Sequence, residues 1–175
     1  VVVFRHPVNG KDFVKRLIGL PGDTVSVDNG KLKINNKALN YEPLDDFVEI
    51  KSKQGPLDSI PRCKNAPVPL ESDCLKSQFR EELPNRTSHL VLDIGSFFGD
   101  NTPEFKVPEK NYFFLGDNRD NSLDSRANGG WFVPLENFVG KGNFIFFSIS
   151  GDTRFWEFWR WPSNIRYSRI FTKIN

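Results

Sequence analysis

One stretch of the chain concentrates side chains that can do chemistry. Residues 116–126 read Gly-Asp-Asn-Arg-Asp-Asn-Ser-Leu-Asp-Ser-Arg, so three aspartates and two arginines accompany two uncharged hydroxyls. Opposite charges this close together can neutralise one another and hold a loop in a single shape, as an active site requires. The alternative is a solvated surface loop, because Asn, Asp, Ser and Gly are also common turn formers.

A second stretch places a lysine between apolar side chains. Residues 13–23 read Phe-Val-Lys-Arg-Leu-Ile-Gly-Leu-Pro-Gly-Asp, which predicts a buried strand ending in a type II turn at Pro21-Gly22. Strand alternation puts Phe13, Lys15 and Leu17 on one face. Burial lowers the pKa of an ammonium group, and the neutral amine is a general base. To act near neutral pH, the Lys15 pKa must fall from about 10.4 by roughly 2 to 3 units, or about 3 to 4 kcal/mol. The alternative is a strand-edge lysine that extends its amine into water.

Taken together, these stretches resemble bacterial type I signal peptidase (leader peptidase) of the Gram-negative type. The similarity rests on Lys-Arg followed by Gly-Leu-Pro-Gly-Asp, and on the motif at 116–126. Further similar segments are Val1 to Pro7, Glu82-Leu83-Pro84-Asn85 with His89, and Trp161-Pro162 with Arg166, Ser168, Arg169 and Ile170. The resemblance implies a membrane-associated serine endopeptidase with a Ser/Lys dyad that cleaves signal peptides from exported preproteins. It also implies a place at the bacterial inner membrane, with the catalytic domain on the periplasmic side.

The same resemblance assigns roles to individual residues. Lys15 would be the general base, and Ser122 would orient its amine. Two ion pairs would support the site, Asp124 with Arg126 and Asp117 with Arg16. A substrate strand would add beside the Lys15 strand, with Val3, Phe13 and Val14 as pocket walls; Val14 is the weakest of these, since alternation turns it away from Lys15.

The nucleophile of the family is not found in the sequence. By resemblance it lies in a Ser-Met-x-Pro segment ahead of the Val1-Val2-Val3 strand, and the same segment supplies a hydroxyl to the oxyanion hole. No Ser-x-x-Pro precedes Lys15, no serine precedes Ser26, and Met is absent. We therefore expect a fragment without the nucleophilic serine and membrane anchor, which is inactive alone.

Composition limits the remaining possibilities. The formal net charge of +2, from 24 Lys+Arg and 22 Asp+Glu, gives no electrostatic case for nucleic acid as a partner. No apolar stretch reaches the 18 or so residues of a membrane span. His6 and His89 stand far apart and no Cys-x-x-Cys occurs, so we expect neither a metal site nor a cofactor. Cys63 and Cys74 could form one disulfide or remain two thiols.

Short apolar runs separated by turn signals predict an all-β fold with two antiparallel sheets. We expect strands at 1–4, 11–20, 24–27, 31–34, 37–41, 47–50, 89–94, 112–115 and 143–150, a helical turn within 133–139, and a short helical piece near Leu75 to Leu83. A discontinuous catalytic core, residues 1–23 and 109–175, would carry a β-rich insertion at 24–108 with a Pro-rich loop.

The C-terminal run 155–161, Phe-Trp-Glu-Phe-Trp-Arg-Trp, mixes large aromatic side chains with charge. Tryptophan favours the membrane interface, so Trp156, Trp159 and Trp161 are candidate contacts with the inner-membrane lipid surface. Alternatively, these rings fill the β core.

A second hypothesis for the function of the whole chain also stays open. In it the protein is a non-catalytic β-rich module that binds peptide or lipid, and Lys15 and the serine loop only stabilise the fold.

Overall fold

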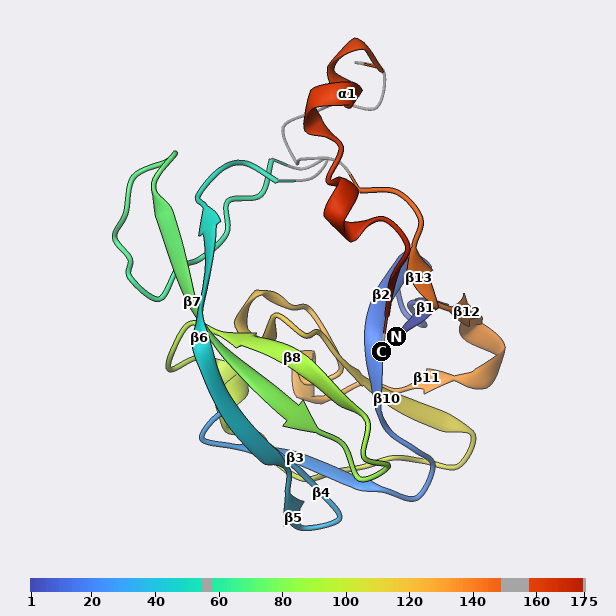
Figure 1. Cartoon of the computed structure of the whole chain (residues 1–175). Coiled ribbons are helices and arrows are strands. Elements are labelled where there is room, and N and C mark those ends of the chain that lie inside the picture. The colour runs from blue at the N-terminus through green and yellow to red at the C-terminus, as the bar shows by residue number, and fades with distance from the viewer. Residues whose placement is uncertain (55–57, 149–157, 175) are drawn as a thin grey trace.

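The computed structural model describes residues 1–54, 58–148 and 158–174, except for the side chains of Arg160 and Trp161. The fold is all-β, as predicted, and its sheets are antiparallel (Figure 1). The strands are β1 Val2–Arg5, β2 Asp12–Gly19, β3 Thr24–Asp28, β4 Lys31–Ile34, β5 Lys37–Ala38, β6 Asn40–Ile50, β7 Asp73–Glu82, β8 Ser88–Asp93, β9 Phe105–Lys106, β10 Asn111–Leu115, β11 Val133–Pro134, β12 Phe138–Lys141, β13 Phe144–Ile145 and β14 Thr172–Lys173. The helices are short: 3-10 turns η1 Phe98–Asp100, η2 Arg119–Asn121, η3 Ala127–Gly129, η4 Leu135–Asn137, η5 Phe158–Arg160 and η6 Tyr167–Arg169, and α1 Trp161–Asn164.

A five-stranded sheet in the order β11-β10-β2-β1-β12 holds both informative stretches. Strand β2 carries Lys15 and ends at the predicted Pro21-Gly22 turn. There Gly22 has a φ of 87°, and the Asp23 amide donates to the Leu20 carbonyl at 3.0 Å. A positive φ costs glycine little, which is why glycine stands at this position of the turn. Strand β10 pairs with β2 and leads directly into the serine loop at 116–126.

A second sheet, in the order β5-β4-β3-β9, packs against the first. Its tight turns at Asn29-Gly30 and Asn35-Asn36 all have positive φ, as hairpin turns of this sequence require. The two sheets share one buried apolar cluster: Ile18, Val25, Val27, Leu32, Ile34, Phe105, Val107, Phe113 and Leu115. The division into a catalytic core and an insertion stays a prediction.

The third sheet, β6-β7-β8, corrects one expectation. Residues 75–83 were expected to be helical, yet Asp73–Glu82 form strand β7, which pairs with β6 on one side and β8 on the other. The segment contains good helix formers, but helix propensity is weak beside a full set of cross-strand bonds and side-chain contacts. The strand expected at 37–41 is divided between two sheets, since Lys37–Ala38 form β5 and pair with β4, whereas β6 begins at Asn40. The strand expected at 47–50 is the end of β6, which runs from Asn40 to Ile50.

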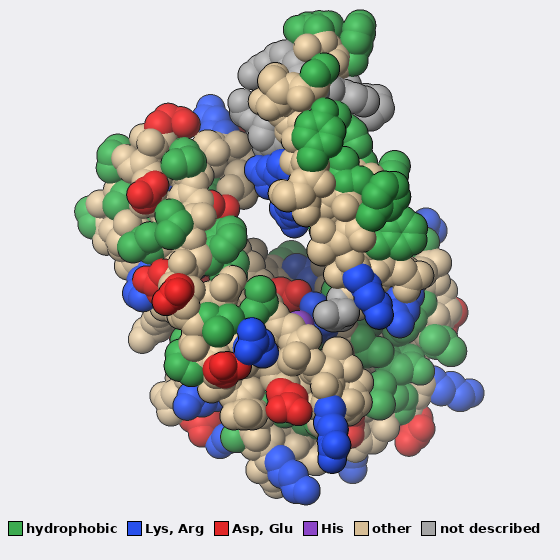
Figure 2. Space-filling model, viewed as in Figure 1, with side chains coloured by type: hydrophobic (Ala, Val, Ile, Leu, Met, Phe, Trp, Pro, Cys, Tyr) green, Lys and Arg blue, Asp and Glu red, His purple; other side chains and the backbone are tan. Residues whose placement is uncertain are grey.

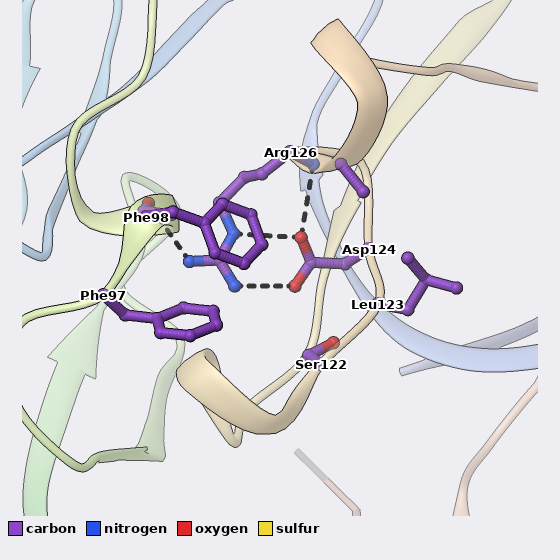
Figure 3. A pocket seen from close by; sticks show the side chains of 8 residues that line it. Phe97, Phe98, Ser122, Leu123, Asp124 and Arg126 are labelled. Atoms are coloured by element: carbon purple, nitrogen blue, oxygen red, sulfur yellow. Dashed lines mark hydrogen bonds and ion pairs between the residues drawn. The ribbon is translucent and has the colours of Figure 1, made fainter.

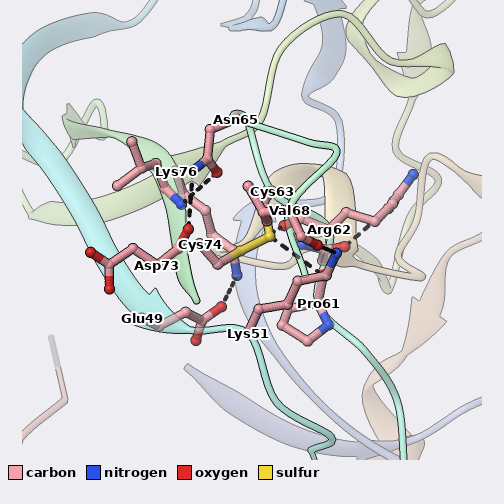
Figure 4. Close-up of a disulfide and its surroundings, with 12 residues drawn as sticks. Glu49, Lys51, Pro61, Arg62, Cys63, Asn65, Val68, Asp73, Cys74 and Lys76 are labelled. Atoms are coloured by element: carbon pink, nitrogen blue, oxygen red, sulfur yellow. Dashed lines mark hydrogen bonds and ion pairs between the residues drawn. A yellow bond between two sulfur atoms is a disulfide. The ribbon is translucent and has the colours of Figure 1, made fainter. Parts of the chain in front are cut away.

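A disulfide joins the Pro-rich loop to this sheet. Cys63 and Cys74 are bonded, and their Cα atoms lie 5.1 Å apart (Figure 4). The adjacent Arg62 leaves the loop toward the serine motif, where its guanidinium stacks on the Phe97 ring and Nε donates to Asn121 Oδ1 at 3.1 Å. The disulfide therefore anchors a loop that touches the residue directly before Ser122.

The C-terminal segment stands apart from the sheets in Figure 1, except where β14 pairs with β13. The run expected at 143–150 is strand only at Phe144–Ile145, and residues 149 and 150 lie outside the described part. Exposed hydrophobic side chains gather on this segment (Figure 2), and they include Phe146, Phe158, Trp159, Tyr167 and Phe171. Trp159 is 65% exposed, so it does not fill the core. Trp156 and the side chain of Trp161 lie outside the described residues. In the described chain, the helices are all too short to cross a bilayer.

Candidate active site

The structure brings Lys15 and Ser122 together across 107 residues of sequence. Nζ of Lys15 donates to Oγ of Ser122 at 2.6 Å. Lys15 comes from the middle of β2, and Ser122 directly follows the 3-10 turn η2. The two meet because β10 pairs with β2 in a register that places Leu115 opposite Arg16, so the serine loop begins beside Lys15.

Burial lowers the pKa of the Lys15 ammonium. Asp124 and Asp117 oppose this change and Arg126 adds to it, but desolvation is the largest cause. The Phe13 ring, 5.9 Å from Nζ, forms part of the apolar surroundings on the same face of β2. A lysine in this setting loses its proton more readily than one in water, and the neutral amine can accept a proton from a hydroxyl.

Asp124 and Arg126 fix the shape of the serine loop. Their side chains form a two-point contact, with Arg126 Nε and Nη2 each donating to an Asp124 oxygen at 2.9 Å, and both are nearly fully buried. The same carboxylate accepts the Gly116 amide at 3.1 Å, which ties the end of the loop to its beginning. Figure 3 shows this pair above Ser122 and next to the Phe97 and Phe98 rings, and all five side chains line one small pocket. This is the ion pair that the resemblance to the family implied.

Gly116 lies where any side chain would push Ser122 away. A Cβ at this position would lie 2.5 Å from Ser122 Cβ, closer still to Ser122 Oγ, and 3.4 Å from Lys15 Nζ. The backbone of Gly116 is not in the left-handed region, so conformational freedom is not the reason for a glycine here. Glycine is needed because any side chain would clash with Ser122.

Arg16 and Asp117 form the second expected contact. Arg16 points to the face of β2 opposite Lys15, and its Nε and Nη2 donate to the two Asp117 oxygens at 2.7 and 2.8 Å. Arg16 is 7% exposed. Planar two-point pairs of this kind fix orientation as well as charge. The neighbours of Lys15 and the start of the serine loop are thereby locked to each other.

The residues predicted to line substrate pockets are divided between two faces. Phe13 lies on the Lys15 face and packs on Phe4, His6 and Trp131. Val3 and Val14 are a cross-strand pair, so both side chains lie on the opposite face, where Val14 is 62% exposed. Their roles stay predictions.

Sequence reasoning missed a buried polar cluster beside the site. Arg119, inside the motif, pairs with Glu81 of β7, and Tyr41 of β6 contacts both. Ser125 was also missed; its Oγ accepts the Phe114 amide at 3.0 Å. Glu81 directly precedes Glu82-Leu83-Pro84-Asn85, the segment that resembles the family, so the sequence pointed to its neighbour. Only the strand pairing shows which of the two glutamates faces the serine loop.

Among the described residues, no group of three or more His, Cys, Asp and Glu side chains is placed to hold a metal ion. The site therefore consists of a partly buried lysine amine, a serine hydroxyl in contact with it and two ion pairs beside them. An amine and a hydroxyl placed in this way are able to exchange a proton.

Comparisons with known proteins show which family the chain is similar to. Residues 1–147 match the family model described as "Signal peptidase, peptidase S26". The chain is 34% identical to signal peptidase I of Rickettsia typhi and 33% identical to that of Rickettsia prowazekii, over 99% of its own length in each case. It spans 64% of the length of these two relatives. A crystal structure of a signal peptidase I from Enterococcus faecalis V583 is 28% identical, covering 79% of this chain and 89% of that one, with a TM-score of 0.41. The family match covers the Lys15 strand and the whole serine motif, and the chain therefore belongs to the signal peptidase family, peptidase S26.

Proposed function

We propose that this protein is a serine endopeptidase that cleaves signal peptides from exported preproteins, with Lys15 as its general base. The observation that carries the proposal is the 2.6 Å contact between Nζ of a partly buried lysine and Ser122 Oγ. A lysine base needs both a lowered pKa and a fixed direction. Burial supplies the first, and the Ser122 hydroxyl supplies the second.

In the proposed reaction, the Lys15 amine takes the proton of a serine hydroxyl as that oxygen bonds to the scissile carbonyl carbon. The resulting ammonium gives its proton to the leaving amine when the peptide bond breaks. Water, activated by the same amine, then hydrolyses the acyl-enzyme. By resemblance to the family, the attacking serine belongs to a Ser-x-x-Pro segment that does not occur before Lys15; that this chain alone is inactive stays a prediction.

We also propose that the exposed aromatic side chains of the C-terminal segment contact the membrane. Trp159 and Phe158 are 65% and 68% exposed, and aromatic rings prefer the interface between lipid and water. Such a contact would hold Lys15 near preproteins at the inner membrane, on its periplasmic side, in line with the resemblance to the family. The disulfide fits an oxidising compartment.

The test is cleavage of a preprotein by the enzyme expressed from its complete gene. Lys15→Ala should abolish turnover while the protein still folds, because the amine is the only group assigned to move the proton. Lys11→Ala, an exposed lysine just before β2, is the matched control and should cleave normally. A normal rate for Lys15→Ala would refute the dyad.

Ser122→Ala separates orientation from attack. It should lose part of the rate, since the base remains but its direction is no longer fixed. A loss as complete as that of Lys15→Ala would give Ser122 a larger role than orientation. If neither change affects cleavage, the second hypothesis gains support, namely a binding module in which these residues only stabilise the loop.

A further inference from the structure

A buried cluster of polar side chains joins the three-stranded sheet to the serine loop. Its centre is Glu81 of β7, whose side chain has no exposed surface. Oε1 of Glu81 accepts from Arg119 Nη2 at 2.7 Å, and Oε2 is hydrogen-bonded to the Tyr41 hydroxyl. That hydroxyl also accepts from Arg119 Nη1 at 3.1 Å and from the Leu32 amide at 3.1 Å. Side chains from β6 and from the serine loop therefore meet at one carboxylate of β7.

The cluster is charged at physiological pH. Burial alone would raise the pKa of Glu81, but the Arg119 charge and the hydrogen bonds of its neighbours lower it to about 2. For Arg119, burial acts against the charged form, yet the Glu81 carboxylate outweighs it and raises the pKa. Separating the two partners of a buried ion pair is strongly unfavourable, because each would then be an uncompensated charge in the protein interior. The pair therefore holds Glu81 and Arg119 together.

The position of Arg119 connects this pair to the candidate active site. Arg119 begins the 3-10 turn η2, which ends one residue before Ser122. Its carbonyl accepts from Arg126 Nη2, so the same residue also holds the arginine of the Asp124 pair. The turn thus has one anchor toward the three-stranded sheet and another toward the serine loop.

A second path runs from Glu81 toward the Lys15 strand. His89 lies between the two carboxylates, with Nε2 3.1 Å from Glu81 Oε1 and 3.9 Å from Asp117 Oδ1, but neither ring nitrogen makes a hydrogen bond with a described residue. Asp117 is the partner of Arg16, the residue next to Lys15. The backbone follows the same route, since the Leu92 amide of β8 donates to the Asp117 carbonyl at 2.8 Å.

We infer that Glu81 is a positioning residue for the Lys15–Ser122 contact. Through Arg119 it fixes the turn that delivers Ser122. The same three-stranded sheet reaches Asp117, the partner of Arg16 next to Lys15, through the Leu92 amide of β8. The three-stranded sheet thereby determines how far the Lys15 amine is shielded from water and how it is oriented, without contacting substrate. This inference rests on the proposed function of Lys15 as base.

The experiment measures the pKa of the Lys15 amine directly, by NMR on protein carrying ¹³C-methylated lysines, with Lys15→Arg to assign the signal. Glu81→Gln keeps the shape and removes the charge. Glu82→Gln, an exposed glutamate of the same strand, is the matched control. Tyr41→Phe is a milder second variant, because it keeps the Glu81–Arg119 pair and removes only the bridging hydroxyl.

The direction of the change distinguishes positioning from simple charge loss. If Glu81 positions the loop, its removal lets water reach Lys15, and the pKa should rise toward its ordinary value by at least about half a unit. The bare Coulombic effect has the opposite sign, since removing a nearby negative charge lowers the pKa of an ammonium. Tyr41→Phe should give a smaller rise, and Glu82→Gln none.

An unchanged or lowered Lys15 pKa in folded Glu81→Gln would overturn the inference. Where Glu81→Gln does not fold, an unchanged pKa in Tyr41→Phe overturns it instead. The readout does not depend on cleavage, so it is separate from a failure of the proposed function, which would appear as normal turnover by Lys15→Ala. In the active enzyme, Glu81→Gln should lower kcat with little change in KM, because it alters the base and not the substrate contacts.

Discussion

Substitution of Gly116 by alanine tests the site with a single methyl group. The added Cβ would lie 2.5 Å from Ser122 Cβ, whereas ordinary van der Waals contact begins near 3.4 Å. Ser122 must therefore retreat by about 1 Å. Its oxygen would then lie about 3.6 Å from Lys15 Nζ in place of 2.6 Å, too far for a hydrogen bond.

A displacement of this size at a catalytic group costs about 10²-fold in rate. Gly116→Ala should therefore reduce kcat for preprotein cleavage by about two orders of magnitude, with a destabilisation of about 1 to 3 kcal/mol from overpacking. Since Gly116 does not have positive φ, backbone strain does not contribute.

The matched control is Gly140→Ala on β12 of the same sheet. A Cβ there meets nothing within 4 Å, and the backbone again lacks positive φ. Cleavage by this variant should be unchanged. If Gly116→Ala cleaved within about twofold of the unmodified enzyme, the Lys15–Ser122 contact would not be needed for catalysis.

Four further predictions concern charge, pH and the disulfide. The cleavage rate should rise with pH through a pKa below the ordinary lysine value, because burial favours the neutral Lys15 amine, and a pH–rate profile measures it. Glu81 is ionised down to a pKa of about 2 in the fold, against 4.5 for a glutamate in water, so its contribution is complete above about pH 4.5 and lost as pH falls toward 2. As pH falls through that range, the free energy of unfolding measured with urea should decrease by about 3 kcal/mol more for the unmodified protein than for Glu81→Gln. Equal decreases in the two proteins would contradict the buried ion pair. Asp124→Asn should destabilise by about 3 to 5 kcal/mol, since it leaves the buried Arg126 unpaired, whereas the exposed Asp12→Asn should change stability little. Replacing both Cys63 and Cys74 by serine should lower the free energy of unfolding, measured by thermal unfolding, by roughly 2 to 3 kcal/mol. Chemical reduction of the unmodified protein should lower it by the same amount.

Some of the site could be read directly from the sequence. The alternation around Lys15 places it beside Phe13 and Leu17 on one face of a strand, and Pro21-Gly22 ends that strand. The motif at 116–126 contains both Asp124 and Arg126, which pair with each other in the structure. These features are local, because period-two alternation and turn chemistry depend on neighbouring residues alone.

The rest depended on contacts between distant segments. The segment 73–82 has helix-forming residues, but two neighbouring strands make it a strand. Likewise, nothing local distinguishes Glu81 from Glu82; their different roles arise because the pleat turns one side chain into the protein and the other into water.

The sequence by itself determined the all-β class, the strand that carries Lys15 and the loop that carries Ser122, since each follows from the order of residues along short segments of the chain. Only the tertiary structure decided that Lys15 is partly dehydrated, that its amine meets Ser122, and that Arg119 of the serine loop pairs with Glu81 of a third sheet. Burial and the pairing of charges are properties of surfaces that meet across the fold, and desolvation changes a pKa only once those surfaces have met.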